Sequence, residues 1–171
     1  ENSASRAISK SIVDQLVSAS PDSRVIARDL VADPLPHLTL EAFADSQVLD
    51  EFLAADTIVI GAPMYNFTLP TQLKTWLDRI LIAGQTFRYT ATGPEGLMGG
   101  KRVIIGLARG GIYDAGSPAA ALEHLESYLR GVFNFIGIEP EFVAADGLAI
   151  GPEQRDASIR QALGQTVRLA A

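Results

Sequence analysis

The run of apolar, mostly β-branched residues at 57–62 constrains the fold of this chain most strongly. A continuous run of this kind is typical of a strand that is buried on both faces of a parallel sheet. A helical pattern over 69–83 follows, with Pro70 near its start, where proline is well tolerated. The run therefore predicts a parallel strand that leads through a short loop into a crossover helix.

The same alternation continues along the chain. Apolar residues at helical spacing predict helices over 3–18, 48–54, 69–83, 122–136 and 154–169. Apolar runs predict strands over 25–30, 57–62, 102–107 and 142–145, and a loop or small hairpin is expected over 87–100. This order indicates an α/β doubly wound parallel sheet with helices on both faces.

A doubly wound fold normally opens with a strand, and none precedes the first predicted helix. In the flavodoxin-like order 2-1-3-4-5 that opening strand is central. We therefore expect a flavodoxin-like, five-stranded sheet whose first strand belongs before Glu1 and is absent from this sequence. Residues 1–171 have the size of a single domain.

The composition limits the classes of function. The formal net charge is -6 and no basic cluster is visible, which argues against nucleic acid, because phosphate neutralisation needs clustered Lys and Arg. The lack of cysteine excludes disulfides and thiol nucleophiles, and no residues have metal-ligand spacing. No apolar run approaches the roughly 20 residues that span a bilayer. These features predict a cytoplasmic protein without a metal, membrane or nucleic-acid partner.

The loop after the 57–62 strand is the first candidate ligand site, because ligands of open α/β sheets bind at the carboxyl ends of the strands. Its residues are Pro63, Met64, Tyr65, Asn66 and Phe67. They offer apolar faces on which a flat ring can stack and amide groups that can contact its polar edge. A loop that merely covers the edge of the sheet is the simpler alternative.

Two further segments fall near the same edge. Arg109, Gly110 and Gly111 follow the 102–107 strand, and paired glycines let the backbone approach a ligand, although an ordinary turn has the same residues. Ser3 and Ser5 lie at a predicted helix start, where free N–H groups and the helix dipole favour an anion. Helix capping explains these serines equally well. One phosphate site and two ring-holding loops together describe a pocket for FMN.

With these motifs the chain resembles the FMN-dependent NADH-azoreductases, a homodimeric branch of the flavodoxin-like NAD(P)H:quinone oxidoreductases. The motifs that carry the resemblance are APMYNF at 62–67, TQLK at 71–74, TFRY at 86–89, GPEGL at 93–97, RGG at 109–111 and FIGI at 135–138. The resemblance implies FMN as cofactor, NADH or NADPH as donor, and ping-pong hydride transfer through the flavin to azo compounds and quinones. No catalytic side chain is expected, because the flavin supplies the chemistry.

The resemblance also implies roles for individual residues. Ser3 and Ser5 resemble the hydroxyls at the FMN phosphate, and residues 63–67 resemble the loop along the isoalloxazine ring. The turn 109–111 resembles the second loop, at the pyrimidine end of the ring. Tyr89 and Phe135 match aromatic positions that form the substrate pocket over the flavin, partly from the partner subunit of a homodimer.

The chain departs from the family in places, and other functions stay open. The segment 38–48 is shorter than expected, and Ala108 stands where serine is common. A flavodoxin-type FMN electron carrier without small-molecule turnover is the main alternative, and a regulatory flavodoxin-like domain is another. The aromatic segment 87–89 and the helix that ends near Phe135 favour a covered substrate pocket, and hence the reductase.

Overall fold

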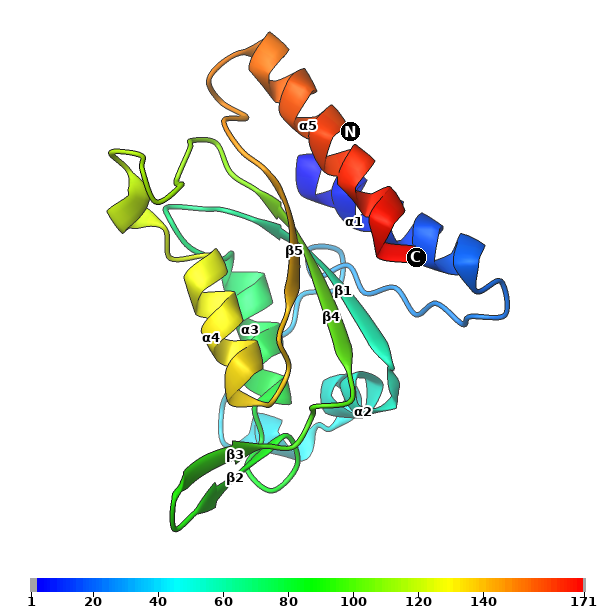
Figure 1. The fold of residues 1–171 in the computed structure, drawn as a ribbon. Helices are drawn as coiled ribbons and strands as arrows, with labels where there is room; N and C mark the ends of the chain where they lie inside the picture. The colour runs from blue at the N-terminus through cyan, green and yellow to red at the C-terminus, as the bar shows by residue number, and fades with distance from the viewer. Residues whose placement is uncertain (1–2, 171) are drawn as a thin grey trace.

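Three parallel strands form the centre of the molecule (Figure 1). The computed structural model describes residues 3–170. The strands of the main sheet lie in the order β1-β4-β5, with β1 at Thr57–Pro63, β4 at Arg102–Ala108 and β5 at Glu141–Ala145. β1 and β4 pair along their full lengths, and β5 pairs with the last five residues of β4, from Ile104 to Ala108. All three strands therefore end at the same edge of the sheet.

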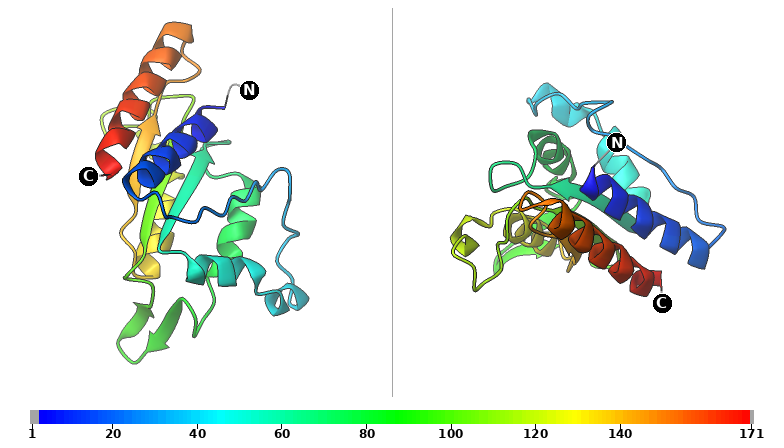
Figure 2. Two further views of the ribbon diagram at one scale, coloured as in Figure 1. Left: turned by 90° about the vertical axis from the view of Figure 1, so that its right-hand side faces the viewer. Right: turned by 90° about the horizontal axis from the view of Figure 1, so that it is seen from above.

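Helices cover both faces of this sheet. They are α1 (Ala4–Ala19), α2 (Gln47–Ala54), α3 (Thr71–Ile80), α4 (Glu126–Phe135) and α5 (Pro152–Thr166), with short 3-10 turns at Glu41–Ala44, Ala120–Leu122 and Val167–Ala170. α1 and α5 lie side by side on one face, and α3 and α4 cover the other (Figure 2). The predicted helices are thus confirmed, although α4 begins later than the expected start at 122.

The residues of β4 divide between two cores because successive side chains of a strand point to opposite faces. Val103, Ile105 and Leu107 pack with residues of α2, α3 and α4. Ile104 packs with Ile8 of α1 and with residues of β5 and α5. Both faces of β4 are therefore buried, as the continuous apolar pattern predicts.

Two glycines let α1 approach the sheet closely. Gly61 and Gly106 are register partners in β1 and β4. A Cβ atom on Gly106 would lie 2.8 Å from Cγ2 of Ile8, and one on Gly61 would lie 3.1 Å from the carbonyl oxygen of Ser5. Since Ser5 lies over the second half of β1, the amino end of α1 is directed toward the carboxyl edge of the sheet.

A small hairpin lies at the end of the molecule opposite to the carboxyl ends of the three parallel strands (Figure 1). Its antiparallel strands are β2 (Phe87–Thr90) and β3 (Gly93–Gly96). The rings of Phe87 and Phe135 are 4.7 Å apart, so the hairpin packs against the carboxyl end of α4. This confirms the hairpin alternative for residues 87–100.

The predicted strand over 25–30 is wrong. The segment forms no strand, and its residues Val25 and Ile26 are 53% and 59% exposed. In the predicted strand order it would pair only with the opening strand, and no described segment takes that place. Ion pairs hold it instead: Arg6 contacts both carboxylate oxygens of Asp29, at 3.0 and 2.8 Å. Within the described residues the main sheet therefore has three strands, where five were expected.

Candidate functional site

The loops that leave the carboxyl edge of the sheet start in register. The N–H of Met64 donates to the carbonyl of Ala108 at 2.9 Å, one residue beyond the end of β1. The N–H of Arg109 donates to the carbonyl of Ala145 at 2.9 Å, one residue beyond the end of β4. The loops after β1, β4 and β5 therefore begin side by side, as the fold class requires.

The predicted loop at 63–67 contains a tight two-residue turn. Tyr65 and Thr68 exchange backbone hydrogen bonds of 2.8 and 3.1 Å. Between them, Asn66 and Phe67 adopt left-handed backbone conformations, with φ of 47° and 74°. Such a conformation costs on the order of 1–3 kcal/mol for a residue other than glycine, and it clusters at ligand sites.

This turn is held from one side and open on the other. The carbonyl of Phe67 accepts the N–H of His124 at 3.0 Å, and the hydroxyl of Thr68 donates to the carbonyl of His124 at 3.2 Å. The N–H groups of Asn66 and Phe67 find no acceptor among the described residues. Tyr65 is 60% exposed and Phe67 is 43% exposed. The turn thus offers two free donors and two accessible rings.

The second predicted loop directs its carbonyls into the protein. The carbonyls of Arg109, Gly110 and Gly111 accept the N–H groups of Leu148, Ala149 and Gly147, at 3.1, 3.0 and 2.9 Å respectively. The N–H groups of Gly110 and Gly111 have no acceptor within residues 3–170. Gly110 is exposed. This loop therefore also presents two free backbone donors.

The side chain of Arg109 contacts three carboxylates. The residue is 5% exposed, and its Nε and Nη2 donate to both carboxylate oxygens of Asp146, at 2.6 and 2.9 Å. Its Nη1 lies 3.4 Å from Glu126 and 3.6 Å from Glu123. Burial acts to lower the pKa of Arg109, but the Asp146 hydrogen bond and the three carboxylates raise it above its usual value. The described carboxylates therefore engage the Arg109 side chain, and a direct contact of Arg109 with FMN stays a prediction.

Glu123 holds the start of α4. Its carboxylate accepts the N–H groups of Leu125, Glu126 and Ser127 at 3.0, 2.7 and 3.0 Å. Burial would raise the pKa of Glu123, but these backbone hydrogen bonds hold it below its usual value. Sequence reasoning missed both Glu123 and Asp146. The contact of Asp146 with Arg109 spans 37 residues, whereas the capping role of Glu123 is local, and its place just before α4 is the signal that could have found it.

The two predicted phosphate hydroxyls lie together at the amino end of α1. The Oγ of Ser3 accepts the N–H of Arg6 at 3.4 Å, which is a helix cap. The Oγ atoms of Ser3 and Ser5 are 3.4 Å apart, and Ser5 is 5% exposed. The capping interpretation is therefore correct for Ser3. The capped end of α1 lies near the carboxyl edge of the sheet, where Ser5 approaches Gly61 of β1.

Tyr89 and Phe135 lie far from these loops within the chain. Both contact Phe87: its ring centroid is 5.6 Å from that of Tyr89 and 4.7 Å from that of Phe135. Tyr89 is 75% exposed and Phe135 is 36% exposed. Phe87 and Tyr89 belong to β2 and Phe135 ends α4. The β2–β3 hairpin lies at the end of the molecule away from the carboxyl ends of β1 and β4 (Figure 1). One chain does not bring the two sets of predicted residues together.

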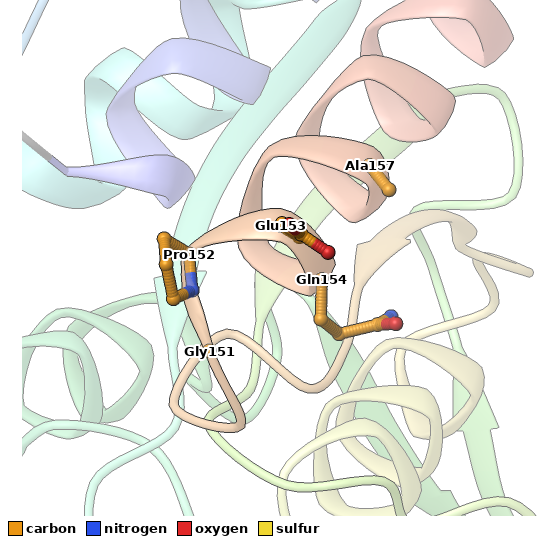
Figure 3. Close-up of a pocket in the computed structure, with 5 residues that line it drawn as sticks. All are labelled: Gly151, Pro152, Glu153, Gln154 and Ala157. Carbon is orange, nitrogen blue, oxygen red and sulfur yellow. The ribbon is translucent and has the colours of Figure 1, made fainter.

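Two concave regions lie outside the predicted loops. A cavity of about 530 Å³ lies at the amino end of α5, lined by Gly151, Pro152, Glu153, Gln154 and Ala157 (Figure 3). A second, of about 350 Å³, has an almost wholly apolar lining and lies between the end of α3 and α4; it is lined by Leu81, Ser127, Tyr128, Gly131, Val132 and Phe135. Within the described residues, no cluster of side chains could hold a metal ion and no helix could span a membrane.

Comparison with known proteins places this geometry in a family. A family model described as the flavodoxin-like fold matches residues 1–169. The chain is 51% identical over 188 residues to FMN-dependent NADH:quinone oxidoreductase 2 of Bradyrhizobium diazoefficiens, covering 99% of this chain and 93% of the relative. It is also 51% identical over 189 residues to the FMN-dependent NADH:quinone oxidoreductase of Methylorubrum populi, with the same coverage.

Solved structures agree. An azoreductase from Bacillus anthracis superposes with a TM-score of 0.91 at 29% identity, over 99% of this chain and 92% of the other. An FMN-dependent NADH-azoreductase from the same species, in complex with FMN, superposes with a TM-score of 0.86 at 28% identity and the same coverage. The three parallel strands, the helices on both faces and the match over residues 1–169 identify this chain as a member of the flavodoxin-like family.

Proposed function

We propose that this protein is an FMN-dependent NADH oxidoreductase that reduces quinones and azo compounds. The observation that carries the proposal is the 51% identity, over almost the whole chain, to relatives named FMN-dependent NADH:quinone oxidoreductase. The loops 63–67 and 109–111, which begin side by side at the carboxyl edge of the sheet, support it, because that edge is where ligands of this fold class bind.

The residues at this edge fit FMN. The free N–H groups of Asn66, Phe67, Gly110 and Gly111 suit the polar edge of an isoalloxazine ring. The exposed ring of Tyr65 suits its flat face. At the amino end of α1, the two adjacent serine hydroxyls and the helix dipole suit a phosphate monoester. When bound, FMN supplies two-electron redox transfer between NADH and the acceptor.

The protein's part in this chemistry is to bind and orient. Backbone N–H groups of the two loops are fixed donors, and donors that are already oriented stabilise negative charge without a reorganisation cost. His124 uses its backbone to hold the turn at Phe67–Thr68. Protons can come from water, so no side chain at this edge is required as an acid.

We further propose a cytoplasmic homodimer. Tyr89 lies in β2 and Phe135 ends α4, and both are exposed. The β2–β3 hairpin lies at the other end of the molecule from the carboxyl edge of the sheet, so we infer that the two rings serve a substrate pocket over the flavin of a partner subunit (Figure 1). The apolar depression beside α4, which Phe135 also lines, suits contact with a second copy. Light scattering would give twice the chain mass, whereas a fully active monomer would contradict the dimer.

The reductase is tested by mixing the FMN-loaded protein with NADH without oxygen. Loss of the yellow flavin absorbance, and its return on addition of a quinone, is the expected result. Persistent absorbance after NADH addition would overturn the proposal. Steady-state NADH oxidation with a quinone separates the reductase from a flavodoxin-type electron carrier, which would show no such turnover.

A further inference from the structure

One buried arginine connects the end of β4 with the loop after β5 and with the start of α4. Arg109 joins β4 to Asp146, the first residue after β5, through a two-point contact. Its third nitrogen faces Glu126 and Glu123, at the start of α4. The side chain of Arg109 is 6% exposed, and that of Glu123 is 13% exposed. A guanidinium shared by three carboxylates is therefore withdrawn from water.

The connection extends to the strained turn. Glu123 precedes His124, whose backbone holds the turn through the carbonyl of Phe67 and the hydroxyl of Thr68. Asp146 precedes residues 147–149, whose N–H groups take all three carbonyls of the 109–111 loop. Through its partners, Arg109 thus reaches both segments that carry free backbone donors.

We propose that Arg109 is a positioning residue that sets the geometry of the Gly110–Gly111 and Asn66–Phe67 donors toward the flavin. This inference rests on the proposed function. By holding the carbonyls of the 109–111 loop toward residues 147–149, the Arg109–Asp146 contact leaves the N–H groups free for the polar edge of FMN. Those donors stabilise the reduced, more negative ring, so their placement affects the reduction potential as well as the affinity.

The planar fork of arginine is required for this role, and a positive charge alone is not enough. Lysine is a single point donor and cannot bind both oxygens of Asp146 while it also faces α4. Arg109→Lys therefore keeps the charge and removes the geometry. Arg102 and Glu141 supply a matched control, because they form the same two-point contact, at 2.6 and 3.1 Å, at the amino ends of the same two strands.

The experiment compares the wild type with Arg109→Lys, Asp146→Asn and Arg102→Lys. FMN is titrated into each apoprotein by flavin fluorescence, and the midpoint potential of the bound flavin is measured. Arg109→Lys is expected to weaken FMN binding at least tenfold and to shift the potential to more negative values. Asp146→Asn should shift both in the same direction by less, and it carries the test if Arg109→Lys does not fold. Arg102→Lys should match the wild type.

Each outcome has one reading. Unchanged affinity and potential in folded Arg109→Lys and Asp146→Asn, with a wild type that NADH reduces, would overturn the positioning role and leave the proposed function intact. Equal losses in Arg102→Lys would also overturn it, since the effect would then belong to any ion pair between β4 and β5. A wild type that binds no FMN, or whose flavin NADH does not reduce, would overturn the proposed function itself.

Discussion

The strands β4 and β5 carry the same kind of ion pair at both of their ends, in two different environments. At the carboxyl end, Arg109 contacts Asp146 and its side chain is 6% exposed. At the amino end, Arg102 contacts Glu141 and its side chain is 38% exposed. Exposed ion pairs contribute little to stability, whereas loss of one partner of a buried pair leaves a charge without compensation. The difference indicates that the carboxyl end depends on its ionic contacts.

The two ends of the molecule, beyond the carboxyl and the amino edge of the main sheet, are held together by different interactions. At the carboxyl edge, charged side chains hold loops that carry free backbone donors. At the amino edge, close packing holds the β2–β3 hairpin, where Gly96 lies against the backbone of Ile136 and Gly137. The first arrangement suits a polar ligand, and the second suits a fixed position for the aromatic side chains.

The largest expected effect is at the buried pair. Arg109→Met leaves Asp146 and Glu123 without their cation, so we expect a loss of about 3–5 kcal/mol in the free energy of unfolding. Arg102→Met at the exposed pair should lose less than about 1 kcal/mol. Urea unfolding of both variants measures the contrast, and equal losses would remove the distinction between the two ends.

The next effect is at the hairpin. A Cβ atom on Gly96 would collide with backbone atoms of Ile136 and Gly137, which cannot move aside as a side chain can. Gly96→Ala should therefore cost about 1–3 kcal/mol. Gly100→Ala is the control, since a Cβ atom there meets nothing within 4 Å. Thermal unfolding compares them, and an unchanged melting temperature in Gly96→Ala would show that packing does not hold this end.

The smallest effect depends on pH. The folded-state pKa of Glu123 is lowered: burial opposes this, but the backbone N–H groups of α4 outweigh it. A lowered pKa adds stability above the ordinary carboxylate value of about 4.3, and this is lost as the pH falls through the folded value. Glu123→Gln should cost about 1 kcal/mol at neutral pH and less below about pH 4. A difference that stays constant down to acid pH would contradict the role of its charge.

The sequence patterns predicted the elements whose residues carry their own signal, above all the buried strands. The β-branched runs gave β1 and β4 because burial on both faces leaves a clear signal. The same reasoning failed at 25–30, where apolar residues were present but no described strand lies beside them. A strand depends on a neighbour that its own residues do not reveal.

In the candidate site, the positions of the loops could be predicted from the sequence, but the long-range contacts of their side chains could not. The positions of loops 63–67 and 109–111 followed from the strand ends, and the structure brings both to one edge of the sheet. The structural role of Arg109 could not be predicted, because its partner Asp146 is 37 residues away. The separation of Tyr89 and Phe135 from these loops likewise depends on how the hairpin packs.

The most direct test of the account is amide exchange at single residues, measured by NMR with and without FMN. The N–H groups of Gly110 and Gly111 have no acceptor within the described chain, so they are expected to exchange quickly in the apoprotein. Bound FMN should slow their exchange. If FMN binds and both N–H groups exchange as fast as before, the flavin does not lie against this loop, and the account of the carboxyl edge is contradicted.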